Sequence, residues 1–235
     1  MSWLEARTPD TRSWVLRLSR FRNDRWSDPV TVVGNGDLLV NWADFPSVTE
    51  VDGTVLVHWL QRGGSGGYDY GIRVSRSLDG GTTWSEPWTP HDDASATEHG
   101  FVSAFPVAER LGLVWLDGRR YARGAGGSEP TDEMTLRFRT LDRRGGAGPE
   151  ILVDGRVCDC CQTDAALTAA GPVVVYRDRS PEEIRDIHVT RLVDGRWTGG
   201  VPVHEDGWHM EACPVNGPAV AARDRDVVVA WFTGA

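Results

Sequence analysis

Short runs of β-branched and aromatic residues recur along the chain, separated by turns rich in glycine and aspartate. Each run is 5 to 6 residues long, which is too short for a stable helix and typical of a buried strand. A shorter apolar stretch and a turn precede each run, as 101–105 precedes 111–115. The pattern therefore predicts antiparallel strand pairs and almost no helix. The clearest runs are 54–59, 111–115, 172–176 and 226–231.

A second element recurs between these pairs, consisting of an apolar strand, a turn and a proline that usually follows a tryptophan. The prolines are Pro29, Pro87, Pro149 and Pro202, which are 58, 62 and 53 residues apart. Together the two elements make a unit of four short strands in a meander. Units of this kind repeated around an axis are the blades of a β-propeller.

The repeat predicts an all-β protein: a β-propeller of four-stranded antiparallel blades, with 1–235 as a single domain. The half blades at the two ends allow two interpretations. They pair to close a four-bladed ring, or the chain is a C-terminally truncated fragment of a larger propeller. The abrupt ends, without a capping segment, favour the fragment. The predicted blades are the half blades 14–34 and 213–235 and the full blades 38–90, 99–153 and 162–204.

Composition narrows the chemistry. All 25 basic residues are arginine. The absence of lysine excludes mechanisms that need a Schiff-base, pyridoxal-phosphate or phosphate-loop lysine. Biased codon usage is enough to explain this absence. The formal net charge of −9 argues against nucleic acid or an anionic membrane as the general partner. No apolar run is long enough to span a bilayer. The N-terminal residues contain no signal-peptide core, so the sequence leaves the localisation open.

The turn at 77–84 carries the most specific motif. Its residues Ser77, Asp79, Gly81, Thr83 and Trp84 match the Asp-box S-x-D-x-G-x-T-W at every fixed position. In such a turn the serine and aspartate side chains bond local backbone N–H groups, and the tryptophan packs between neighbouring sheets. The chain therefore resembles the sialidase-like Asp-box, or BNR-repeat, β-propellers over essentially its whole length.

The segment Cys158-Asp-Cys160-Cys161 also resembles a bacterial subgroup of that family, whose members are often exported to the periplasm or the medium. The resemblance implies a six-bladed propeller longer than this chain and an activity like that of an exo-α-sialidase. It also implies an arginine triad for the substrate carboxylate, an aspartate acid/base and a tyrosine–glutamate nucleophile pair. The Asp-box itself is structural in this family.

Because successive strands of a blade reverse direction, two of the connections lie at one rim and two at the other. One rim has short, simple turns, whereas the other has long loops rich in arginine, aspartate, histidine and cysteine, and we expect the function there. The catalytic candidates on these loops are Asp117, Arg119, Tyr176, Arg177, Asp178, Arg179 and Glu183. The substrate-binding candidates are Arg62, His99, Arg185 and Asn216.

Arginines recur just after the second strand of successive blades, where paired hydrogen bonds can hold a carboxylate or a sulfate. An ordinary ion-pair network at the rim is the alternative. The first functional hypothesis is a glycoside hydrolase acting on an acidic glycan, with a carbohydrate or another small acidic ligand as partner. The second is a non-catalytic or metal-binding propeller that binds a glycan or a protein. A redox enzyme or metalloenzyme is a third class, supported only by the cysteine and histidine loops.

The cysteines lie in two such loops, which the blade repeat places next to each other. Thiolates from both, together with His209, can converge on one soft metal ion such as zinc or copper. A disulfide between adjacent cysteines, or from Cys213 to one of the other three, is the competing interpretation, and free thiols are the third. The metal-ligand candidates are Cys158, Cys160, Cys161, His209 and Cys213.

Overall fold

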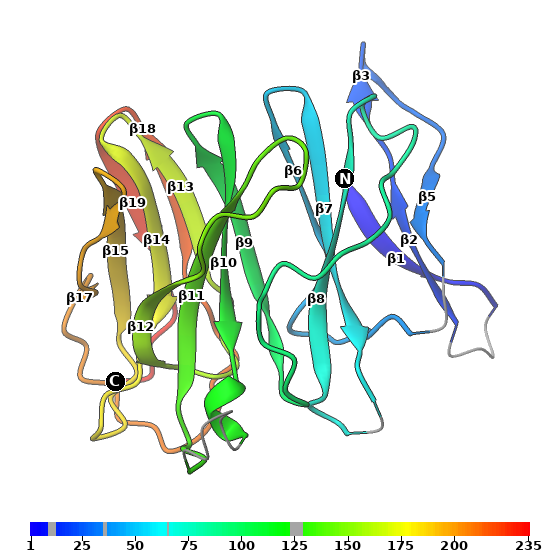
Figure 1. The fold of residues 1–235 in the computed structure, drawn as a ribbon. Coiled ribbons are helices and arrows are strands. Elements are labelled where there is room, and N and C mark those ends of the chain that lie inside the picture. Colours follow the sequence, from blue (N-terminus) through cyan, green and yellow to red (C-terminus); the bar gives the residue numbers. More distant parts are fainter. Residues whose placement is uncertain (9–12, 35–36, 65, 123–128) are drawn as a thin grey trace. The chain divides into compact units, whose positions relative to one another are not determined.

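Antiparallel strands dominate the computed structural model, which describes residues 1–8, 13–34, 37–64, 66–122 and 129–235. The strands fall into two compact units, Met1–Asp92 and Asp93–Ala235 (Figure 1). In the described ranges the helical structure is one 3₁₀ turn, η1 (Arg119–Tyr121). None of the described helical structure is long and apolar enough to cross a bilayer. These observations confirm the all-β prediction.

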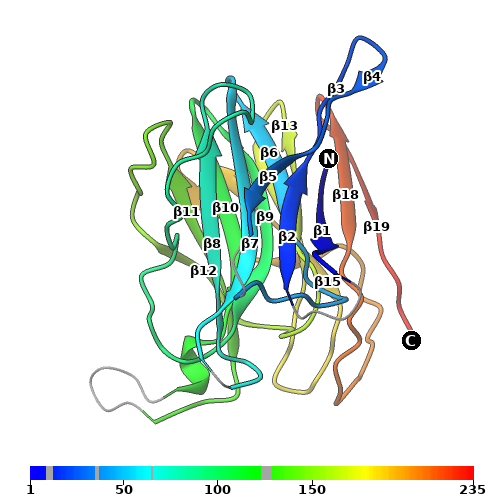
Figure 2. The ribbon, with the colours of Figure 1, turned by 90° about the vertical axis from the view of Figure 1, so that its right-hand side faces the viewer.

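The first unit contains two three-stranded sheets and a small hairpin that extends beyond the first sheet (Figure 2). The first sheet consists of β1 (Ser2–Ala6), β2 (Trp14–Leu18) and β5 (Val30–Val33), and β2 lies between the other two strands. The hairpin consists of β3 (Phe21–Arg22) and β4 (Arg25–Trp26). The second sheet consists of β6 (Ser47–Val51), β7 (Thr54–Arg62) and β8 (Tyr70–Ser77).

The core of this unit forms where the apolar runs of β2 and β7 are buried. Leu16, Val57 and Trp59 are each at most 1% exposed and belong to one apolar cluster. Burial of each such side chain contributes about 1.5–3 kcal/mol. Trp84 packs against the same cluster, which holds the turn before it against the core.

Local hydrogen bonds build the 77–84 turn, as its residue types predict. The Ser77 hydroxyl accepts the Gly81 N–H at 2.7 Å, and one Asp79 oxygen accepts the Thr83 N–H at 2.9 Å. Hydrogen bonds from the Thr83 hydroxyl and N–H and from Ser77 hold the pKa of Asp79 well below its usual range. Gly81 has φ +93°, a conformation that side chains disfavour. The motif is therefore structural.

The second unit contains a four-stranded sheet, a five-stranded sheet and a hairpin. The strands of the four-stranded sheet are β9 (His99–Val107), β10 (Arg110–Asp117), β11 (Met134–Leu141) and β12 (Ile151–Val157). Those of the five-stranded sheet are β13 (Asp164–Thr168), β14 (Gly171–Arg177), β15 (Ile187–Val193), β16 (Arg196–Trp197) and β17 (Val201–Pro202). The hairpin consists of β18 (Ala219–Arg223) and β19 (Asp226–Ala230).

Neighbouring sheets of the second unit pack through their first strands, because β13 contacts both β9 and β18. Trp197 closes the gap between the first two sheets, with its ring centroid 4.9 Å from that of Phe138 and 6.4 Å from that of Phe105. Two-residue turns lie at the upper end of these sheets in Figure 1, and the long loops 158–163, 178–186 and 203–218 lie at the lower end. The loops are thus grouped at one end, as the meander predicts.

The strands differ from the expected repeat in two places. β1 pairs with β2 along its whole length, although the repeat begins only at 14. In the 38–90 segment the expected fourth strand is reduced to an isolated bridge between Val74 and Trp88. The assignment of the whole chain to a single domain stays a prediction.

Candidate functional site

Five charged side chains lie together at the lower end of the second unit, where β12 ends and the 178–186 loop begins. Three are arginines and two are acids. We call them the rim cluster: Arg156, Asp178, Arg179, Glu183 and Arg185.

The 178–186 loop folds locally around Ser180. Its N–H donates to the Ile184 carbonyl at 3.0 Å, and its hydroxyl accepts the Glu182 and Ile184 N–H groups at 3.1 and 3.2 Å. This closed turn holds Glu183 at φ +59°, a left-handed conformation that costs a side-chain-bearing residue about 1–2 kcal/mol. Such conformations persist only where the surroundings hold them in place, and here three arginines bind the Glu183 carboxylate.

The Glu183 carboxylate is the centre of the rim cluster. Arg179 donates to it from Nη2 at 2.9 Å and from Nε at 3.0 Å. Arg185 donates at 2.8 Å, and Arg156 donates at 3.2 Å. Hydrogen bonds and charge from Arg179, with the charges of the other two arginines, lower the pKa of Glu183 to about 2. The side chain nevertheless stays 20% exposed, so the cluster is accessible from solvent.

Asp178 has the opposite electrostatic environment. Burial and the nearby negative charge of Asp154 raise the pKa of Asp178 to about 7, and its side chain is 17% exposed. The His188 imidazole lies 3.7 Å from the Asp178 carboxyl. One loop therefore presents a carboxyl that is about half protonated at pH 7 and, five positions later, a carboxylate that is ionised. Two acids with separated pKa values are what acid–base catalysis requires.

Tyr176 is almost fully buried, with 1% of its surface exposed. Its hydroxyl donates to Asp154 at 2.6 Å, and burial, together with the Asp154 charge, raises the pKa of Tyr176 far above its usual value. A phenol that resists ionisation and lies out of solvent is a poor nucleophile. The structure thus gives Tyr176 a supporting position under Asp178.

Arg177 points to the other side of β14 and is 2% exposed. Its guanidinium donates to the backbone carbonyls of Asn216 at 2.9 Å, Arg185 at 2.5 Å and Phe232 at 2.9 Å, and lies 4.9 Å from the centre of the Trp208 ring. These hydrogen bonds hold together the backbone segments that contain the three acceptor carbonyls. This corrects the predicted catalytic role of Arg177, and Asn216 takes part through its backbone carbonyl.

Asp117 and Arg119 form a separate, buried network at the end of β10. Asp117 is fully buried and accepts hydrogen bonds from Arg119 at 2.6 and 2.7 Å and from the Trp115 indole at 2.9 Å. The His99 imidazole lies 3.6 Å from Asp117 and 3.0 Å from Asp93. Burial raises the pKa of Asp117, but the hydrogen bond and charge of Arg119 outweigh it, and the result is about 2. A buried carboxylate held ionised in this way is unsuited to donate a proton.

The structure thus divides the candidates. Arg179 and Arg185 contact Glu183, and Asp178, at the start of the same loop, feels the charge of Arg156. Asp117, Arg119 and His99 form their own network. Arg62 ends β7 in the first unit.

Sequence reasoning missed Arg156 and Asp154, which lie on β12. The predicted blade ended at 153, whereas β12 continues to Val157 with a register shift between Asp154 and Val157. Simple alternation along a strand therefore could not place these two side chains.

Two of the four cysteines form a disulfide and the other two are free thiols. Cys160 and Cys213 form a disulfide across the two loops, while Cys158 and Cys161 are buried thiols with their sulfurs 3.1 Å apart. A hydrogen bond from Cys161 lowers the pKa of the Cys158 thiol. His209 does not join them: its side chain is 59% exposed, with Nε2 3.9 Å from Glu211. Among the described residues, His209 is outside both groups of converging ligand atoms, which corrects its assignment as a ligand.

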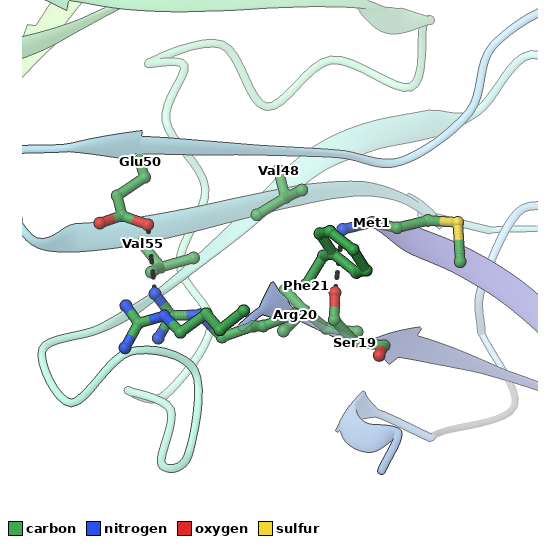
Figure 3. Close-up of a pocket in the computed structure, with 9 residues that line it drawn as sticks. Met1, Ser19, Arg20, Phe21, Val48, Glu50 and Val55 are labelled. Atoms are coloured by element: carbon green, nitrogen blue, oxygen red, sulfur yellow. Dashed lines mark hydrogen bonds and ion pairs between the residues drawn. The ribbon is translucent and has the colours of Figure 1, made fainter. Parts of the chain in front are cut away.

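A cavity of about 290 Å³ lies in the first unit, between β2 and the β6–β7 pair (Figure 3). The Met1 ammonium donates to the Ser19 carbonyl at 3.0 Å, and Arg20 pairs with Glu50 at 3.3 Å. None of the predicted site residues lines this cavity. The concentration of titratable groups with shifted pKa values, rather than this hollow, marks the candidate site.

No family model matches the chain, and no curated protein matches it. Solved structures do. The α-L-arabinofuranosidase of Fusarium graminearum bound to an iminosugar inhibitor has a TM-score of 0.59 and 15% identity, over 97% of this chain and 70% of that one. The α-L-arabinanase of Penicillium chrysogenum bound to arabinobiose has a TM-score of 0.52 and 12% identity, over 94% and 67%. A polysaccharide lyase, an ulvan lyase, has 0.52 and 14%, over 93% and 57%.

These likenesses, together with the antiparallel meanders, define the chain as an all-β protein of the β-propeller class. They also overturn the resemblance to the sialidase-like BNR-repeat family, since the structural neighbours are arabinan-degrading enzymes and a lyase. The physical reason is that the residues matching the 77–84 motif make local hydrogen bonds within the turn. Such a turn can form on a hairpin of any antiparallel sheet and carries little information about the family.

Proposed function

We propose that this chain is a carbohydrate-active β-propeller that binds an acidic glycan at the rim cluster and hydrolyses a glycosidic bond next to it. The observation that carries the proposal is the convergence of Arg156, Arg179 and Arg185 on one partly exposed carboxylate, that of Glu183. Planar guanidinium groups are the side chains best suited to paired recognition of carboxylate or sulfate.

The arginines have weak competitors on the solvent side. Arg179 also pairs with Asp132 at 3.0 Å, but the Asp132 side chain is 75% exposed, and exposed pairs of this kind contribute only about 0–1 kcal/mol. The carboxylate or sulfate of a glycan can replace the Asp132 carboxylate at Arg179 Nη2 at little cost, while Arg179 Nη1 keeps its hydrogen bond to the Asp132 carbonyl at 2.7 Å. Glu183 then stays in place as the ionised acid of the site.

The two acids of the rim cluster support hydrolysis. Asp178, with its pKa near 7, is suited to protonate the leaving oxygen, and the ionised Glu183 is suited to activate water or to stabilise the developing positive charge. The structural neighbours are in keeping with this class of reaction, since they include glycoside hydrolases and a lyase bound to a GlcA(1-4)Rha3S repeat.

The test measures new reducing ends released from polygalacturonate and glucuronoxylan, with linear arabinan as the neutral polymer. We expect cleavage of an acidic polymer and a loss of about 10²–10⁴-fold in kcat for Asp178→Asn, the usual contribution of a general acid. Arg179→Ala is expected to raise KM about tenfold or more. Arg225→Ala, in the exposed β18–β19 turn, is the matched arginine control and should behave like the wild type.

Binding of an acidic polymer without cleavage would reject the hydrolase and leave a glycan-binding propeller. Equal activity on arabinan and on the acidic polymers would reject the role of the arginines. Wild-type activity in Asp178→Asn would reject the proposed acid.

A further inference from the structure

The 158–163 loop between β12 and β13 brings three cysteine sulfurs together. The Cys158 sulfur lies 3.1 Å from that of Cys161 and 3.8 Å from that of Cys160. Cys158 and Cys161 are 1% and 2% exposed. A buried cysteine that only fills space behaves as a small apolar side chain and needs no other sulfur beside it. Three sulfurs this close together on one short loop therefore indicate a common role.

The spacing suits a single thiophilic metal ion. All three sulfurs lie within 4.8 Å of one another. Sulfurs bound to one zinc ion at about 2.3 Å in a tetrahedral arrangement are about 3.8 Å apart. The measured separations of 3.1 and 3.8 Å therefore need to change by less than about 1 Å to accommodate an ion of that size.

Nearby charge also suits a group of thiolates. Arg185 is 4% exposed, and its positive charge acts on Cys158, as that of Arg177 acts on Cys161. The Arg185 Nη1 atom is buried without a hydrogen-bond partner and lies 3.9 Å from the Asp159 carboxylate. Buried guanidinium groups offset the negative charge that three thiolates around a divalent ion leave in excess.

The disulfide removes one of the three ligands. Cys160 is bonded to Cys213, which lies 53 positions away on the 203–218 loop. Only a thiolate is a good metal ligand, so the site is incomplete while this bond exists. The Cys213 sulfur is not part of the group formed by the other three and converges instead with Asp159 and Cys160.

We propose that Cys158, Cys160 and Cys161 bind one thiophilic ion, Zn²⁺ or Cu⁺, when the Cys160–Cys213 disulfide is reduced, and that formation of this disulfide closes the site. Opening the bond takes two electrons and two protons and yields two thiols: an external dithiol supplies both and becomes a disulfide, whereas a phosphine supplies the electrons, water supplies the protons and the oxygen, and the phosphine becomes its oxide. The bond forms again by the reverse exchange, in which an external disulfide accepts the two electrons and the two protons. Metal binding then releases the thiol protons to solvent. This proposal does not depend on the proposed hydrolysis, although Arg185 contacts Glu183 and also acts on Cys158.

The test uses the whole chain under anaerobic conditions, reduced with a phosphine and freed of reductant. Zn²⁺ and Cu⁺ are titrated in separate arms against chromophoric chelators, and protein-bound metal and alkylatable thiols are counted. We expect one ion per chain after reduction and none before. We expect Cys158→Ser or Cys161→Ser to weaken binding at least tenfold, and His209→Ala to bind as the wild type does.

The decisive variant is Cys213→Ser, which cannot form the disulfide. We expect it to bind one ion without prior reduction, and its thermal unfolding shows whether it is folded. If the folded variant fails to bind, Cys213 is a ligand and its assignment as the closing partner is overturned. Stoichiometric binding by the oxidised wild type would overturn the redox dependence. A Cys158–Cys161 disulfide found after reduction and metal addition would overturn the metal site.

Discussion

The raised pKa of Asp178 makes a quantitative prediction for the substitution Asp178→Asn. The folded protein holds this proton more tightly than the unfolded chain, because the pKa is about 7 in the folded state and 3.8 for an unperturbed aspartate. Stability is therefore lost as the pH rises from about 4 to 7, where the folded protein must give up the proton that its structure favours. Asparagine has no proton to lose, so the substitution removes this cost.

The magnitude follows from the two pKa values. Each tenfold change in proton affinity corresponds to about 1.4 kcal/mol, so the shift from 3.8 to about 7 sets an upper limit of about 4 kcal/mol. Because the side chain is 17% exposed and the loop can relax, we expect about 2 kcal/mol. At pH 8 the Asp178→Asn variant should therefore be more stable than the wild type by about 2 kcal/mol.

Urea unfolding of both proteins between pH 4 and pH 8 measures this difference. The free energies of unfolding should differ by a constant amount near pH 4, and the difference should grow in favour of the variant up to about pH 7. A difference that does not change with pH would show that Asp178 titrates normally, and the assignment of its proton to catalysis would then fail. Asp226→Asn, at an exposed strand end, is the control and should show no such growth.

Three further predictions concern the described contacts. Arg177→Ala should lower the free energy of unfolding by about 3 kcal/mol, because three backbone carbonyls lose a charged donor. A raised KM with unchanged thermal stability would instead show that Arg177 binds the substrate. Glu183→Gln should destabilise the chain by about 1–2 kcal/mol at pH 7, since three guanidinium groups lose their carboxylate. The lowered pKa of Glu183 makes that loss constant above about pH 4.5 and smaller as the pH falls toward 2, as urea titrations at several pH values will show. Trp197→Ala should cost about 2–3 kcal/mol in calorimetry because it removes the ring that packs edge-on against both Phe105 and Phe138, whereas Trp42→Ala, at a side chain 83% exposed, should cost almost nothing.

Much of the fold could be predicted because it depends on local patterns. Runs such as 172–176 are buried on both faces in the structure, and uninterrupted apolar runs of that length indicate buried strands. The residues that define the 77–84 motif are joined by hydrogen bonds within eight positions, so the turn could be recognised from the local sequence. β1 was missed because its sequence, Ser2–Ala6, ends in exposed residues and it pairs with β2 as an edge strand.

The site was harder to predict because its contacts cross between sheets. Sequence spacing placed arginines after each second strand, but could not show that Arg177 faces the protein interior while Arg179, two positions later, faces the rim cluster. The pairing of Arg156 with Glu183 joins a strand residue to a loop residue 27 positions away. The sialidase resemblance failed for a related reason, since it rested on a local turn that carries no information about these long-range contacts.

The central claim is that the arginines of the rim cluster recognise an acidic glycan. Isothermal titration of trigalacturonate into the wild type, Arg179→Ala and the control Arg225→Ala tests it most directly. We predict binding by the wild type and the control, and affinity weakened about tenfold or more in Arg179→Ala, with arabinotriose binding less tightly than the acidic trisaccharide. Equal affinity in all three proteins, or tighter binding of arabinotriose, would contradict the account.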